Sequence, residues 1–139
     1  MIRMLIFVDT NIFVAARNKR DINHQRAVEL LETALRGRYG QAFTSDYVFD
    51  EAVTVALKRT GRADIAIRTG QLILISSPRI ALLNVDDEVF KSAWEKFQKL
   101  AERGLSFTDC TILALMERHG IDYLMSFDEQ FDGLVKRIY

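Results

Sequence analysis

The sequence has little of several things that would mark a specialised class of protein. Its 139 residues include one cysteine and one proline, and 19 lysines and arginines are balanced by 19 aspartates and glutamates. The single cysteine, Cys110, excludes a disulfide framework within the chain and a cysteine-rich zinc site. A net charge of zero excludes a basic field over the whole protein, so any nucleic-acid site must be a local patch.

The sequence also lacks long apolar runs and segments that would separate domains. No uncharged apolar stretch approaches the ~20 residues of a membrane helix, so no membrane association is expected. The first residues lack the layout of a signal peptide, because the early apolar run ends at an acid without a small-residue cleavage site. We therefore expect a cytoplasmic protein. No repeat, low-complexity segment or long linker divides the chain, which predicts a single domain over residues 1–139.

What the sequence does contain is an alternation of strand-like and helix-like segments. This alternation predicts an α/β fold in which helices cover both faces of a parallel sheet. Phe90, Trp94 and Phe97 have the spacing of a core or dimer face on their helix. Strands are predicted at about 4–8, 41–44, 79–85, 122–126 and 134–138. Helices are predicted at about 12–16, 23–35, 45–59, 62–74, 86–103 and 106–119.

The first predicted strand ends in three polar residues, Asp9, Thr10 and Asn11. Ligands of open α/β sheets bind beyond the carboxyl ends of the strands, so an acid at this place is a candidate site residue. A simple turn or a helix N-cap is the alternative explanation of Asp9.

Glu51 lies at the border of the apolar stripe of its predicted helix, close to Val48 and Val55, whereas Asp50 points to solvent. A half-buried carboxylate costs free energy unless it is paired, hydrogen-bonded or bound to a metal. A salt bridge to an arginine and a metal site both satisfy this requirement.

Two further acids are expected near the same edge of the sheet. Asp109 follows Ser106 by three residues, the spacing of a capping box, which is the alternative to a functional role. Asp128 follows the strand that ends at Ser126, in the same topological place as Asp9. Asp132 competes with Asp128 for this role, since residues four apart share a helical face.

Acids gathered in one crevice repel each other, and a hard divalent cation relieves that repulsion. Carboxylate and water oxygens are the ligands that Mg²⁺ and Mn²⁺ prefer. Such an ion lowers the pKa of bound water and stabilises the charge of a phosphoryl transition state. The acids therefore indicate metal-assisted hydrolysis of a phosphodiester.

Four segments resemble the PIN domain and, within that family, the VapC toxins of type II toxin–antitoxin modules. They are residues 7–11, the helix with Glu51, residues 105–110 and residues 126–131. The resemblance covers essentially the whole chain. It implies a PIN-like three-layer α/β/α fold with a central parallel sheet of about five strands. It also implies an endoribonuclease dependent on Mg²⁺ or Mn²⁺, homodimers, and a cognate antitoxin whose C-terminal segment covers the active-site groove.

The same resemblance assigns the catalytic and metal-binding roles to four acids. Asp9 and Asp109 then hold the main ion, while Glu51 and Asp128 bind it through water or hold a second ion. The supporting polar residues are Asn11, Thr10 and Ser126, together with Asp132 as the competitor of Asp128.

Two basic clusters are the candidates for contact with RNA phosphates. Solvated helix ends are the alternative explanation of such clusters. The basic residues are Arg17, Lys19, Arg20, Lys58, Arg59 and Arg62.

Three other functions compete with a toxin ribonuclease. One is a catalytically silent PIN-like module that only binds RNA or a protein, although four retained acids argue against it. Another is a PIN nuclease of general RNA processing. The third is a receiver-type α/β domain, which requires an acidic pair near the first strand, where this sequence has only Asp9.

Overall fold

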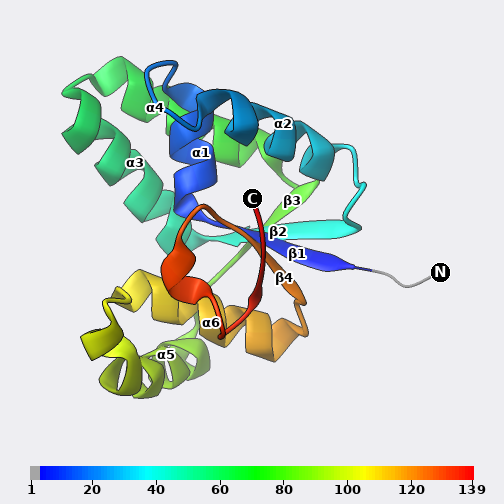
Figure 1. Ribbon diagram of the computed structural model, residues 1–139, viewed down its shortest axis with the longest axis vertical. Coiled ribbons are helices and arrows are strands. Elements are labelled where there is room, and N and C mark those ends of the chain that lie inside the picture. Colours follow the sequence, from blue (N-terminus) through cyan, green and yellow to red (C-terminus); the bar gives the residue numbers. More distant parts are fainter. Residues whose placement is uncertain (1–3) are drawn as a thin grey trace.

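The centre of the molecule is a parallel sheet of five strands, as predicted, and the strand order is β3-β2-β1-β4-β5. The computed structural model describes residues 4–139, so the residues 1–3 used in the signal-peptide argument lie outside the described part. Figure 1 shows β1 in the middle of the sheet, between β2 and β4. The strands are β1 Leu5–Val8, β2 Gln41–Ser45, β3 Ile80–Leu83, β4 Tyr123–Met125 and β5 Lys136–Ile138.

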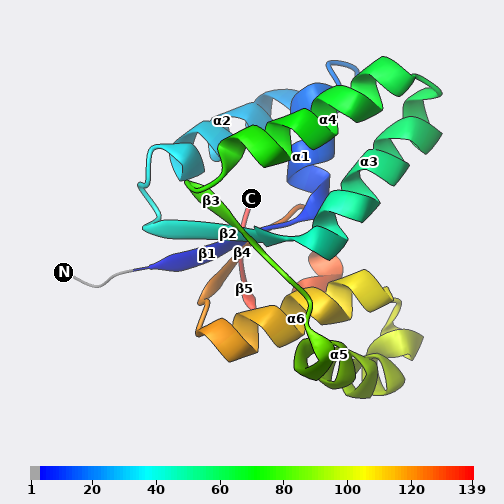
Figure 2. The same ribbon diagram turned by 180° about the vertical axis from the view of Figure 1, so that it is seen from behind.

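Helices cover both faces of this sheet, which confirms the predicted three-layer architecture. One face carries α1 Thr10–Arg17, α2 His24–Leu35, α3 Asp46–Thr60 and α4 Ala63–Ser76, and the other carries α5 Asp87–Leu100 and α6 Phe107–His119 (Figures 1 and 2). Two short 3₁₀ turns, η1 Ala101–Arg103 and η2 Glu129–Phe131, complete the described chain. Between residues 4 and 139, no helix is both long and apolar enough to cross a membrane.

Local signals explain where the helices begin and end. Ser45 caps α3 by accepting a hydrogen bond from the Val48 amide at 3.2 Å, and Asp86 caps α5 in the same way. Gly61 ends α3 with a φ of 65°, a left-handed conformation that glycine adopts without the cost a Cβ imposes. The element boundaries therefore follow from the capping residues at the helix ends.

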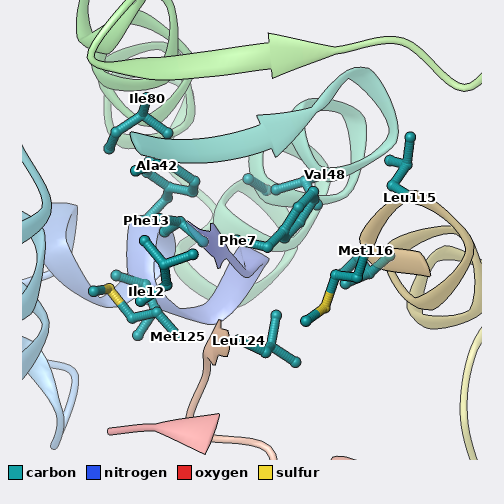
Figure 3. Packing of buried hydrophobic residues seen from close by; sticks show 14 of the residues in the cluster. Phe7, Ile12, Phe13, Ala42, Val48, Ile80, Leu115, Met116, Leu124 and Met125 are labelled. Atoms are coloured by element: carbon teal, nitrogen blue, oxygen red, sulfur yellow. The ribbon is translucent and has the colours of Figure 1, made fainter. Parts of the chain in front are cut away.

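The core brings β1 and β4 to the same level in the sheet. Phe7 is paired with Leu124 and Val8 with Met125, so both strands end side by side. In Figure 3, Met125 points to the α1 side with Ile12, whereas Leu124 points toward the α6 side. These side chains are fully buried, and burying each contributes roughly 1.5–3 kcal/mol. Asp9 and Ser126, which follow Val8 and Met125, are therefore held side by side at the carboxyl ends of the strands.

The aromatic face of α5, for which a core or dimer face was predicted, belongs to the core of the chain only in part. Phe90 is 49% exposed and Trp94 is 51% exposed, whereas Val89 and Ala93 are buried. Only Phe97 of the three aromatic residues packs against the core. The reason is that α5 forms the outer part of its layer and packs mainly on α6, so its small residues face inward and its larger ones lie at the rim.

Candidate active site

Asp9 is held by its own helix and by the loop after β4. It is 3% exposed and caps α1, because its Oδ1 accepts a hydrogen bond from the Thr10 amide at 2.7 Å. The Ser126 hydroxyl donates to Asp9 Oδ2 at 2.6 Å. The same hydroxyl oxygen accepts from the Asp128 amide at 3.0 Å, so Ser126 joins both acids at the strand ends.

Asn11 connects the same groups from α1. Its Nδ2 donates to Asp9 Oδ2 at 3.3 Å and to Ser126 Oγ at 3.2 Å, and its Oδ1 accepts from the Phe127 amide at 3.1 Å. The first of these bonds orients Asp9, and the other two join α1 to the loop after β4. Asn11 and Ser126 therefore hold Asp9 and the loop that carries Asp128 by hydrogen bonds.

The structure brings the four predicted acids to one small hollow. Asp9, Glu51, Asp109 and Asp128 all line a space of about 140 Å³ at the carboxyl ends of the strands. Asp109 reaches it from the first turn of α6, where it also completes a capping box with Ser106. Asp109 therefore both caps α6 and lines the hollow, so the two explanations do not exclude each other. The other lining residues are Thr10, Asn11, Val14, Val55 and Arg59.

Burial and mutual repulsion change the acidity of two of these carboxyls. Burial raises the pKa of Asp9 from 3.8 to about 7, the Ser126 hydrogen bond opposes this rise, and the negative charges of Asp109 and Glu51 add to it. Burial also raises the pKa of Asp109 to about 6, with Glu51 and Asp128 adding repulsion. Without a cation, the hollow therefore disfavours the ionised forms of Asp9 and Asp109.

The hollow fits a hard divalent cation by its donors and not by a ready-made cage. Within residues 4–139, no three histidine, cysteine, aspartate or glutamate side chains are already arranged to hold a metal ion. Carboxylates repel each other, so drawing three of them together requires a cation. Thr10 supports the fit, because this residue lines the hollow and its buried Oγ1 has no hydrogen-bond partner in the described protein. Oxygen donors of this kind suit Mg²⁺ or Mn²⁺.

Asp132 does not share the hollow with Asp128. The expected common helical face is not formed, because η2 is a single 3₁₀ turn that ends before Asp132. Asp132 instead pairs with Arg137, with Nε to Oδ1 at 2.6 Å and Nη2 to Oδ2 at 3.1 Å. These bonds lower the pKa of Asp132, so it stays charged on the outside of the loop.

Arg137 is the residue near the site that the sequence did not indicate. It lies in β5 among ordinary strand residues, and no motif or spacing marks it. Its Nη1 donates to the backbone carbonyl of Ser126 at 2.9 Å. A hydrogen bond to a backbone carbonyl does not depend on the residue type of its acceptor, so the amino-acid sequence does not indicate it.

The predicted basic residues divide into three groups. Arg59 lines the hollow, with Lys58 beside it in the last turn of α3. Arg17, Lys19 and Arg20 are exposed at and after the end of α1. Arg62 forms a bidentate pair with Asp64, with Nη2 to Oδ2 at 2.7 Å.

The fold and the site together are typical of one family of proteins. They combine a parallel five-stranded sheet with four acids around a hollow at the strand ends. Residues 6–136 match the family model of the PIN domain, and the chain belongs to this family.

Its similar proteins include VapC nucleases. VapC20 of Mycobacterium tuberculosis, a 23S rRNA-specific endonuclease, is 31% identical over 129 residues, which are 93% of this chain and 93% of that protein. The VapC ribonuclease of Archaeoglobus fulgidus is 27% identical over 129 residues, 92% of this chain and 80% of the relative.

Solved structures agree with the fold. The crystal structure of VapC20, described as a sarcin–ricin loop cleaving toxin, has a TM-score of 0.80 at 29% identity and covers 93% of this chain and 94% of that chain. VapBC2 from Rickettsia felis, bound to a DNA fragment from its promoter, has a TM-score of 0.65 at 17% identity, over 97% of this chain and 98% of that chain.

Proposed function

We propose that this protein is a metal-dependent endoribonuclease that hydrolyses RNA phosphodiester bonds as the toxin of a toxin–antitoxin pair. The observation that carries the proposal is the hollow lined by Asp9, Glu51, Asp109 and Asp128 at the strand ends. The names of similar proteins support it, since VapC20 is a 23S rRNA-specific endonuclease and the relative from Archaeoglobus fulgidus is a VapC ribonuclease.

The acids are the groups that would hold Mg²⁺ or Mn²⁺. Asp9 and Asp109 would hold the main ion, with Glu51 and Asp128 acting through water or on a second ion. When bound, such an ion supplies an activated water and stabilises the charge that develops on the phosphoryl group. Asn11 and Ser126 keep Asp9 oriented through bonds of 3.3 and 2.6 Å, so its carboxylate need not reorganise during the reaction.

Cleavage of RNA with and without divalent ions tests the proposal. The purified chain is expected to cut ribosomal RNA at defined positions in Mg²⁺ or Mn²⁺, to stop in EDTA, and to resume when the ion is restored in excess. Equal cleavage in EDTA would contradict the metal requirement. RNA that is bound but never cut would favour a catalytically silent PIN module, and cleavage of precursor RNAs alone would favour a role in RNA processing.

Contacts to RNA phosphates are assigned in this proposal to those predicted basic residues that form no salt bridge within residues 4–139. Arg59 is the first of them, because it is the cation that lines the acidic hollow. Lys58, Arg17, Lys19 and Arg20 extend the basic surface from the ends of α3 and α1. Arg62 is left out, because Asp64 already holds its guanidinium.

The double substitution K58Q/R59Q is expected to weaken RNA binding about 10-fold at low salt and to reduce the slope of log affinity against log salt by about 1–2. Two lost phosphate contacts release fewer counterions, which is why the slope changes. Fluorescence anisotropy with a labelled RNA at several salt concentrations measures both quantities. The control R36Q/R38Q removes the same charge from exposed residues before β2, at the opposite edge of the sheet, and should leave the slope unchanged.

The proposal also includes the partners of the protein and its location in the cell. We infer a cognate antitoxin, because solved structures of similar fold include the VapBC2 complex. A homodimer, a location in the cytoplasm and a function as one domain over residues 1–139 complete it. Co-expression with the product of a neighbouring small gene tests the antitoxin, and light scattering tests the dimer.

A further inference from the structure

We propose that Arg137, locked by Asp132, is a positioning residue that holds the loop carrying Ser126 and Asp128 in place at the acidic hollow. The inference rests on the proposed nuclease function for its activity readout only. Arg137 itself touches none of the acids that line the hollow, so it acts through the Ser126 backbone.

The environment of Arg137 is unlike that of a solvated strand residue. Its side chain is 4% exposed, although it belongs to a strand at the edge of the sheet. One nitrogen donates to the Ser126 carbonyl at 2.9 Å, and two others form the bidentate pair with Asp132. The ring of Tyr139 lies 4.1 Å from its guanidinium carbon and covers one face. So little of this side chain is exposed that the geometry favours a structural role over a contact with RNA phosphates.

The Ser126 carbonyl is a sensitive place for such a contact. The hydroxyl of the same residue donates to Asp9 and accepts from the Asp128 amide, so a rotation at Ser126 disturbs two of the four acids. The loop is also anchored further along, because Arg103 donates to the carbonyl of Gln130 at 2.7 Å and to that of Asp132. Two guanidinium groups thus fix the backbone between Ser126 and Asp132 from outside the hollow.

The planar fork of arginine explains why this residue type is required. It donates to a carbonyl and to both oxygens of a carboxylate at the same time, which a lysine ammonium does not do in one geometry. Groups that orient the residues of a metal site commonly change activity or metal affinity by about 10–100-fold when they are removed. We assign that role to the Arg137–Asp132 pair.

The test compares R137M, R137K and D132N with the control D64N. Asp64 is a matched control, because it is an exposed acid in the same kind of bidentate arginine pair, on α4. R137M is expected to lower kcat about 10–100-fold with an unchanged KM for RNA, and R137K to recover part of it. D132N should act in the same direction with a smaller effect, D132N/R137M should be no worse than R137M, and D64N should keep the kcat of the wild type.

Amide hydrogen exchange of the free protein gives a readout that needs no activity. In R137M and D132N the amides of Phe127 and Asp128, which donate to Asn11 and Ser126, should exchange at least about 10-fold faster, while those of α3 keep their rates. Unchanged exchange and unchanged kcat in R137M would overturn the proposal. So would equal acceleration in α3, which indicates global destabilisation, or a raised KM at constant kcat, which indicates an RNA contact. If the wild type cuts no RNA, the proposed function fails and the exchange rates still decide the role of Arg137.

Discussion

The substitution D9N is expected to abolish RNA cleavage, with a loss of about 10³-fold or more, and to make the protein more stable in EDTA. Activity is lost because the amide removes the most buried anionic oxygen donor from the hollow. The fold is kept, because an asparagine fills the same volume and still accepts the hydrogen bond of the Thr10 amide.

The gain in stability follows from the raised pKa of Asp9. Its pKa is 3.8 in the unfolded chain and about 7 in the folded one, so folding is favoured fully below 3.8 and this contribution is lost as the pH rises through 7. At about pH 8 the ionised carboxylate opposes folding by up to about 4 kcal/mol, since each pKa unit corresponds to ~1.4 kcal/mol. Asparagine removes this cost, less the hydrogen bonds that it makes less well.

Thermal unfolding in EDTA measures the effect. D9N is expected to melt about 2–8 °C above the wild type at about pH 8, and the difference should vanish near pH 4. The control D50N changes an exposed acid on α3 beside Glu51 and should alter neither stability nor cleavage. A D9N protein that melts below the wild type at the higher pH, or one that still cuts RNA normally, would disprove the role given to Asp9.

The second large effect is a dependence of metal affinity on pH. The affinity for Mn²⁺ is expected to fall about 10³-fold between about pH 8 and pH 5, because bound protons compete with the ion. Asp9, with a pKa of about 7, accounts for about 100-fold over that interval. Asp109, with a pKa of about 6, accounts for about 10-fold more.

Isothermal titration of the metal into the free protein in buffers of different ionisation enthalpy tests this directly. Close to two protons should be released per ion at about pH 5, and almost none at about pH 8. Affinity that stays constant over this range would mean that these two carboxyls do not bind the ion. E51Q should weaken metal binding and lower the number of protons released at about pH 5, because the negative charge of Glu51 contributes to the raised pKa values of Asp9 and Asp109.

Much of the fold follows from local chemistry that can be seen in single segments. The apolar run before Asp9 predicts a strand buried on both faces, and β1 Leu5–Val8 is such a strand. Ser45 and Ser106 predict helix starts, because a hydroxyl at these places satisfies free backbone amides, and both caps are present. Alternation of strands and helices then leaves a parallel sheet as the arrangement, with the strand ends at one edge.

The same local logic does not predict which side chains find partners across the chain. Asp128 and Asp132 are equivalent in sequence, yet one lines the hollow and the other is held by an arginine of β5. The difference arises because η2 closes after a single turn and directs Asp132 away from Asp128. Phe90 and Trp94 have the spacing of a core face as well, and only the position of α5 at the rim leaves them exposed.

The sequence by itself determined the class of fold and indicated Asp9, Glu51 and Asp109 as candidate site acids, because strand-end position, helix periodicity and capping are properties of neighbouring residues. Only the tertiary structure decided how those acids are held and charged. Ser126 reaches Asp9 across 117 positions, and Arg137 fixes Ser126 through a backbone carbonyl. Burial raises the pKa of Asp9 because the whole core closes around it. Such contacts and fields depend on where distant segments pack, and no single segment specifies them.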